Sequence, residues 1–252
     1  MAPVTAPPAP AAGERLGELV IGRRFNGPET SANGGYACGA LARFVGEPAE
    51  ITLRLPPPLE TPLAVHAAED GDGARLLDGD AVVAEGRPVG AVDAEPPVLP
   101  SFDEAVAATA SHPWLGTRHM LSDCFVCGPE RGRHADGLGV TFGALAGDEE
   151  IGAAPFVPDE TVAVDGIVRP EVVWAALDCP SYAPSIWRVS GLALLGRLTA
   201  QRERDVRAGE RLAAVGWSLG AEGRKHETAS ALVDVDGAVV ARARATWIEL
   251  RG

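Results

Sequence analysis

The chain has 252 residues and a formal net charge of −13 at pH 7. Its hydrophobic fraction of 46% and charged fraction of 23% are typical of a globular protein, and the length suffices for one large domain or two smaller ones. The acidic excess argues against nucleic acid or an anionic membrane as the main partner. No apolar run approaches the ~20 residues of a membrane-spanning helix.

Residues 1–13 are rich in alanine and proline, and we expect them to form a disordered tail. This stretch lacks the basic start and the apolar core of a secretory signal. The four cysteines are too few for a disulfide framework in a chain of this length. We therefore expect a cytoplasmic protein with reduced thiols.

The first predicted helix, "GGYACGALARFV" (Gly34–Val45), begins with two adjacent glycines. Each glycine costs a helix about 1 kcal/mol relative to alanine, so the pair needs a reason. One reason is a helix-entry turn or tight packing against a neighbouring element. The other is a ligand that approaches the backbone where a Cβ atom would block it. Thr30, Ser31 or Asn33 can cap this helix.

A proline- and acid-rich stretch, Ala91–Ala105, divides the chain, and the same order of signals appears on either side of it. Each half has one helix followed by segments with strand-like alternation, joined by Asp/Gly turns. We therefore expect two similar domains, at 14–95 and 124–252, with a linker at 96–123.

The clearest matches between the halves lie in the predicted strands. "AVVAEGR" (Ala81–Arg87) matches "AVVARAR" (Ala238–Arg244), and "LETPLAV" (Leu59–Val65) matches "AGERLAAV" (Ala208–Val215). These matches, in the same order, indicate an internal duplication. Strands joined by short turns after a single helix are typical of an α+β fold with antiparallel sheets.

The second predicted helix has a proline and an acid in its first turn, at Arg169–Glu171. Pro180 disfavours helix at the preceding residue, which places Asp178 near the C-terminal end of the helix. A carboxylate beside the negative end of a helix in a partly apolar site should have a raised pKa, which suits a general base. A solvated aspartate in a loop is the alternative. Asp178 aligns with Ala42 of the first half.

Two cysteines form a C-x-x-C pattern at Cys124 and Cys127, with His119 and His134 nearby. These residues could hold zinc or be redox-active. The histidines do not supply a second well-spaced pair, so we expect a turn with two small, buried thiols, no bound metal and no cofactor. The other two cysteines are expected in the core or lining a pocket: Cys38 and Cys179.

Three segments resemble a known family. "GGYACGALA" (Gly34–Ala42) is similar to the glycine-led helix of acyl-CoA thioesterases with two fused hotdog domains, and "WAALDCPS" (Trp174–Ser181) is similar to their second helix. "CFVCGPERGRHADGLGVTF" (Cys124–Phe142) resembles a segment ahead of hotdog domains in actinobacterial thioesterase-like proteins. The resemblance implies a double hotdog fold, in which two tandem domains each wrap an antiparallel sheet around a helix.

The resemblance also implies a function in fatty acid metabolism: hydrolysis of acyl-CoA or acyl-carrier thioesters. The helix-start amides of Gly34 and Gly35, with Asn33 beside them, would stabilise the developing oxyanion. Asp178 would activate water, and Thr199 is the candidate for the hydroxyl residue of the family site. The family's glutamine has no counterpart near Arg244.

Two other functions remain open at this point. The same fold supports hydration or dehydration of an enoyl thioester, although the loop with an acid and a histidine that is typical of that family is absent. A non-catalytic protein that binds acyl thioesters or lipids is the other alternative, which the missing glutamine favours. Two fused domains can pair within one chain, and further association into a homo-oligomer is compatible with the sequence.

Overall fold

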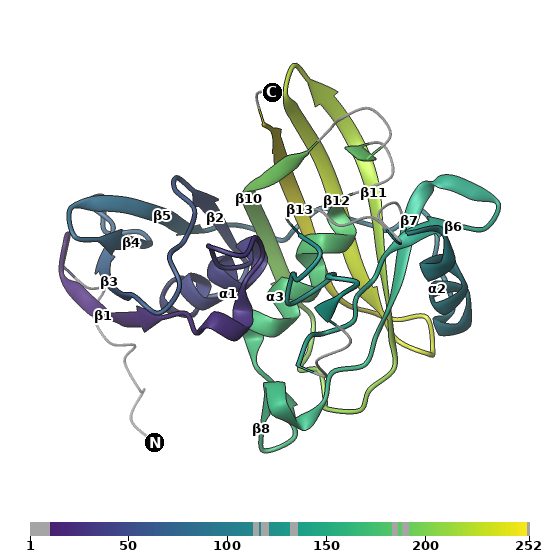
Figure 1. Cartoon of the computed structure of the whole chain (residues 1–252). Coiled ribbons are helices and arrows are strands. Elements are labelled where there is room, and N and C mark those ends of the chain that lie inside the picture. Colours follow the sequence, from purple (N-terminus) through teal and green to yellow (C-terminus); the bar gives the residue numbers. More distant parts are fainter. Residues whose placement is uncertain are drawn as a thin grey trace.

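The structure is a computed structural model that describes residues 11–112, 116, 121–131, 136–182, 186–187 and 192–250. Within these residues, one antiparallel sheet of 11 strands runs through the whole molecule. Two helices, α1 and α3, lie side by side on one face of this curved sheet (Figure 1). The predicted α+β class with antiparallel sheets is confirmed.

The first half of the sheet surrounds α1 (Gly34–Val45). Its strands lie in the order β1-β3-β4-β5-β2. Strands β3, β4 and β5 form a meander, and the two strands that flank α1 in the sequence, β1 and β2, lie on either side of it. The bounds of these strands are as follows: β1 Arg15–Val20, β2 Ala49–Leu53, β3 Pro62–Ala67, β4 Ala74–Asp78 and β5 Ala81–Pro88.

The second half repeats this arrangement around α3 (Pro170–Asp178), with the order β7-β11-β12-β13-β10. The short strand β6 (Gly143–Leu145) pairs with the outer side of β7, and β8 (Ala163–Val164) with β9 (Ile167–Val168) forms a separate hairpin. The longer strands have these bounds: β7 Asp148–Phe156, β10 Ala193–Arg202, β11 Leu212–Glu222, β12 Lys225–Val233 and β13 Val239–Glu249.

The two halves correspond strand by strand. The matched segments "AVVAEGR" and "AVVARAR" lie in β5 and β13, which occupy equivalent places in the two strand orders. The halves join where β2 pairs antiparallel with β10, from Thr52 opposite Arg197 to Ala49 opposite Ala200. Because of this pairing, the two sheets continue into one another and α1 is brought against α3.

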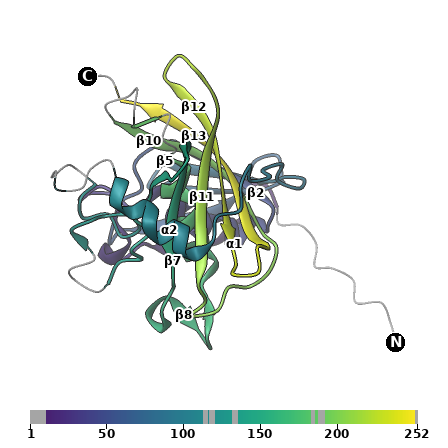
Figure 2. The same cartoon turned by 90° about the vertical axis from the view of Figure 1, so that its right-hand side faces the viewer.

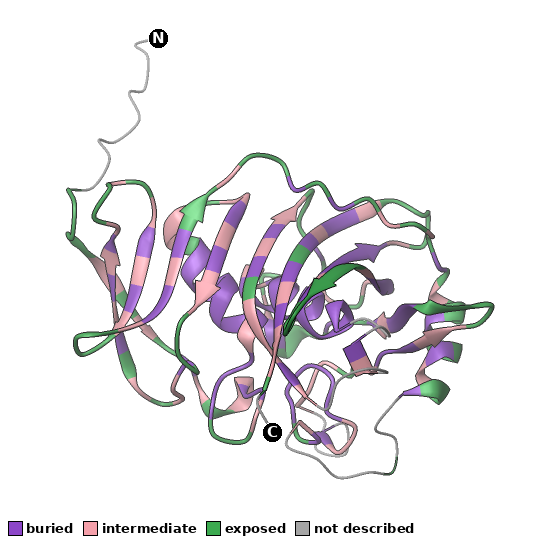
Figure 3. Cartoon of the chain, turned by 90° about the horizontal axis from the view of Figure 1, so that it is seen from above, coloured by how far each residue is buried: buried purple, intermediate pink, exposed green. Residues whose placement is uncertain are grey.

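The core lies between the helices and the inner face of the sheet, where purple marks the buried residues (Figure 3). Both helices are buried along most of their length, which explains their apolar composition on all sides. Leu41 of α1 and Trp174 of α3 are fully buried there. None of the helices in the described part of the chain is long and apolar enough to span a membrane.

A third helix, α2 (Phe102–Ala108), lies within the segment expected as a linker and packs against β7 and β11 (Figure 2). Its start is fixed by a capping box, in which the Ser101 hydroxyl accepts from the amide of Glu104 and the Glu104 carboxylate accepts from the amide of Ser101. The composition of this segment indicated only a divider, although Ser-x-x-Glu is a helix signal.

Candidate functional site

The candidate site forms where the start of α1 meets the end of α3. The two helices pack antiparallel, since Gly35 approaches Ala175 and Asp178 while Gly39, one turn later, approaches Glu171 and Trp174. The N-terminal amides of α1 therefore lie beside the C-terminal acid of α3.

The glycines of α1 permit this close contact. A Cβ atom at Gly35 would lie 2.4 Å from the Cβ of Asp178 and 2.8 Å from the carbonyl oxygen of Trp174, and a Cβ at Gly39 would lie 2.6 Å from the Cα of Glu171. At Gly34 a Cβ would meet only the side chains of Leu195 and Leu53. Tight packing of the two helices is thus a sufficient reason for glycine at position 35. The same packing brings the Gly35 amide within hydrogen-bonding distance of Asp178.

Asp178 is fully buried, and one of its oxygens is held by two donors. Its Oδ2 accepts from the Gly35 amide at 2.8 Å and from Nδ2 of Asn33 at 2.9 Å. Its Oδ1 is also buried and has no hydrogen-bond partner in the described part of the structure. Burial raises the pKa of Asp178 to about 7, although both hydrogen bonds favour the charged form. The expected direction of the shift agrees with this value, and burial is its main cause.

Asn33 has two roles in this arrangement. It is the N-cap of α1, because its Oδ1 accepts from the amide of Tyr36 at 2.9 Å. Its Nδ2 then points the other way, toward Asp178. The sequence suggested the cap but could not show that the same side chain orients the carboxylate.

The two glycine amides differ in what they can offer a ligand. The Gly35 N–H donates to Asp178 and is therefore not free for an oxyanion in this structure. Tyr36 donates to its cap and Ala37 to the carbonyl of Asn33. Among the first amides of α1, only that of Gly34 has no protein acceptor in the described residues. Gly34 is thus the donor left at the positive end of the helix.

A cavity of about 250 Å³ opens at this junction. Its lining includes Gly34 and four polar residues: Ser31, Asn33, Arg54 and Asp178. Its other walls are largely apolar and come from both halves of the molecule, including these residues: Leu53, Pro57, Leu121, Leu194, Leu195, Trp247 and Ile248. A small apolar chain with one polar group at its end fits such a lining.

Thr199 lies elsewhere, which corrects the expectation that it supplies the site's hydroxyl. The β10–β13 pairing shifts register between Leu195 and Arg197, at Gly196. Because this bulge reverses the alternation, Leu195 and Leu198 face the helices, whereas Thr199 lines a separate polar depression with Arg244. A bulge of one residue cannot be read from an alternating sequence.

The duplicated fold creates a second junction, where the start of α3 meets the end of α1, and its residues differ. Pro170 occupies the place of Gly34 and has no amide hydrogen. Glu171 replaces Gly35, and Ala42 replaces Asp178. The second junction therefore lacks both the donor and the acid of the first.

The remaining sequence candidates have these positions. Cys38 is buried in α1, and Cys179 follows α3 and lines the cavity together with Cys124 and Cys127. The thiols at 124 and 127 are buried within a turn, as expected. His119 and His134 lie outside the described residues.

Solved structures similar to this chain over its whole length share its fold. A putative thioesterase II from Thermobifida fusca is 14% identical, with 96% of each chain covered and a TM-score of 0.55. The TesB protein of Mycobacterium avium is 12% identical, with 95% of this chain and 96% of that chain covered and a TM-score of 0.58. The dehydratase domain of a mycocerosic acid synthase-like polyketide synthase is 18% identical, with 98% and 99% covered and a TM-score of 0.56.

These likenesses establish the double hotdog fold that the sequence predicted. The structural neighbours include proteins described as thioesterases and one dehydratase domain, so they do not choose between the two chemistries. No protein-family model matches the sequence, and no curated protein matches it.

Proposed function

We propose that the protein hydrolyses acyl thioesters, carried by coenzyme A or by an acyl-carrier protein, at the junction of α1 and α3. The single observation that carries this proposal is Asp178. A buried carboxylate with one oxygen fixed by two donors and the other unpartnered lines an apolar cavity, beside an unoccupied helix-start amide.

The geometry supports a direct attack by water. A water molecule bound to Oδ1 of Asp178 gives its proton to the carboxylate as its oxygen attacks the carbonyl carbon of the thioester. The carbonyl oxygen, which becomes negative, accepts from the Gly34 amide at the positive end of α1. The C–S bond then breaks, the acid product forms, and the thiolate leaving group takes up the proton.

The same hydrogen bonds keep Asp178 in position for this step. Asn33 and the Gly35 amide hold Oδ2 of Asp178 in place. Because the carboxylate is rigid, this also fixes the direction of Oδ1. The Ser181 hydroxyl donates to the Asp178 carbonyl at 2.6 Å and accepts from Nε1 of Trp247 at 2.9 Å, which secures the end of α3. Positioning of this kind supplies much of the rate of an enzyme.

Hydration of an enoyl thioester is the less favoured chemistry, because it requires a second protein group that donates a proton to the substrate. No histidine is among the described residues that line the cavity. The second junction also has no carboxylate equivalent to Asp178, because Ala42 stands at that position.

A panel of acyl-CoA thioesters from acetyl to palmitoyl tests the proposal. Substrate loss should be followed by chromatography, because the four cysteines of the protein would react with a thiol dye. We expect turnover by the native protein and a fall of about 10²- to 10⁴-fold in Asp178→Asn, the range typical of a lost general base. Asparagine can keep both hydrogen bonds at the position of Oδ2, so the fold should persist.

Two results would contradict the proposal. Full activity of Asp178→Asn would remove Asp178 from the mechanism. Saturable binding of acyl thioesters without hydrolysis of any, on coenzyme A or on a carrier protein, would identify a binding protein instead.

A further inference from the structure

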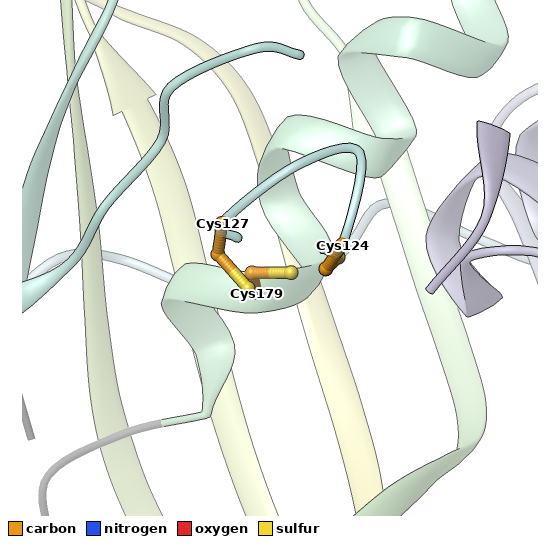
Figure 4. A group of neighbouring side chains, drawn as sticks. All are labelled: Cys124, Cys127 and Cys179. Carbon is orange, nitrogen blue, oxygen red and sulfur yellow. The ribbon is translucent and has the colours of Figure 1, made fainter. Parts of the chain in front are cut away.

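Three cysteines that are distant in the sequence meet at one wall of the cavity. The sulfur atoms of Cys124, Cys127 and Cys179 all lie within 4.8 Å of one another, and all three side chains are buried. Figure 4 shows the turn that carries Cys124 and Cys127 arching over the end of the helix that leads to Cys179. The described residues contribute no further thiol, imidazole or carboxylate to this group.

The turn between the first two cysteines has a geometry suited to binding a metal. The Gly128 amide donates to the Cys124 carbonyl at 2.9 Å, which closes the turn. A Cβ atom at Gly128 would lie 2.4 Å from the Cys124 nitrogen, so only glycine fits after the second cysteine.

The protein holds this turn in place before any ligand binds. The Phe125 amide donates to the carbonyl of Asn26 at 2.8 Å, and the Val140 amide donates to the carbonyl of Val126 at 2.9 Å. Phe125 and Val126 are fully buried in the core. The positions of the two sulfurs therefore cost little further ordering on binding.

We propose that Cys124, Cys127 and Cys179 bind a zinc ion. Thiolates are soft ligands, and three of them in a buried site select zinc over magnesium or calcium. A tetrahedral zinc with Zn–S bonds of ~2.3 Å separates its sulfurs by ~3.8 Å. The sulfurs of the three cysteines, all within 4.8 Å of one another, are compatible with that spacing. The fourth position faces the cavity that these cysteines line, where a water molecule completes the coordination.

The proton balance of binding is simple. Zinc is bound by thiolates, so its binding releases to solvent the protons that the three thiols carry. The ion would join the turn at 124–127 to the end of α3, next to Asp178. The proposal rests on the thiols alone, so it stands whether or not the protein hydrolyses thioesters.

Metal content measures the proposal directly. We expect about one zinc per chain in the full-length protein purified without a polyhistidine tag or added metal, measured by plasma mass spectrometry. Cys127→Ser should lose most of this zinc. Cys38→Ala is the matched control, because Cys38 is equally buried but lies outside the group, and it should keep its zinc.

Two measurements on the native chain decide the question if Cys127→Ser does not fold. Cobalt added to the chelator-treated protein should give the sulfur-to-cobalt charge-transfer absorption of thiolate ligands. The number of cysteines that react with an alkylating agent should rise by three when a chelator is added, because Cys38 stays buried with or without the metal. Zinc far below one per chain without the cobalt absorption would overturn the proposal. So would zinc retained by a folded Cys127→Ser, or a disulfide between these cysteines in the freshly purified protein.

Discussion

At the scale of single residues, the site depends on a few side chains that each make two contacts. Asn33 caps α1 with its oxygen and holds Asp178 with its nitrogen, so stability and positioning are joined in one amide. Asp178 in turn has one oxygen held by two donors, while the other has no hydrogen-bond partner in the described residues. Substitutions that remove only one of the two contacts can separate these roles.

Asn33→Ser makes that separation. Serine caps a helix about as well as asparagine, so the free energy of unfolding should change by less than about 1 kcal/mol. Serine is too short to donate to Asp178 as well, so we expect kcat on a thioester to fall about tenfold or more. Denaturant unfolding and steady-state kinetics on the same preparation measure the two effects, and equal losses in both would show that Asn33 serves only the fold.

A buried histidine away from the site makes stability depend on pH. The Nδ1–H of His112 donates to the carbonyl of Phe142 at 2.7 Å, and burial lowers the pKa of His112 below its usual value of 6.5. The unfolded chain therefore binds a proton that the folded chain does not. This contribution to stability is complete above about pH 6.5 and is lost as the pH falls toward the lower, folded pKa.

His112→Asn should flatten that dependence, because asparagine can donate to the same carbonyl without titrating. His66→Asn is the control, since His66 also contacts a carbonyl but is partly exposed. Unfolding free energies measured at a series of pH values between 5 and 8 test this, and an equal slope in the native protein and His112→Asn would contradict it.

Among the helices and strands, the contact between α1 and α3 determines how the candidate site is formed. Gly35 and Gly39 remove the side chains that would separate the helices, and the resulting approach brings an amide of one helix to the carboxylate of the other. The second junction differs, because Pro170 and Ala42 stand where the first junction has Gly34 and Asp178.

Gly35→Ala and Gly34→Ala separate packing from helix propensity. Both changes favour the helix slightly. At Gly35 the new methyl group meets Asp178 and the backbone of Trp174, so we expect a loss of about 1–3 kcal/mol or more. At Gly34 it meets the movable side chains of Leu195 and Leu53, so the loss should be smaller. Equal unfolding free energies for the two variants would contradict this account of the junction.

Much of the fold, and the position of Asp178 within it, could be predicted from the sequence. The repeated order of helix and strands indicates the double fold, and Pro180 places Asp178 at the end of α3. Thr199 was misplaced because the bulge at Gly196 reverses the alternation of β10. The sequence did not indicate that Cys179 lies beside Cys124, because the two residues are 55 positions apart and only the packing of the helices brings them together.

At the scale of the whole molecule, the single sheet makes the cavity a joint product of both halves. Leu53 comes from β2 and Leu195 from β10, the two strands that pair at the centre. A cavity of about 250 Å³ is small for a ligand pocket, so we expect short acyl chains to be hydrolysed faster than palmitoyl.

Leu195→Ala should extend the preferred chain length. The leucine lines the cavity beside Gly34, and its removal adds space for several carbon atoms there. The ratio of kcat/KM for a long to a short acyl thioester should rise in the variant. A ratio that stays the same or falls would place the acyl chain elsewhere.

We expect activity at only one of the two junctions, and one comparison tests this. Asp178→Asn and Glu171→Gln make the same change, from acid to amide, at buried positions at opposite ends of α3. We predict that kcat/KM on the best thioester substrate falls about 10²-fold or more in Asp178→Asn and stays near native in Glu171→Gln. Equal losses in the two variants, or a loss only in Glu171→Gln, would contradict the account.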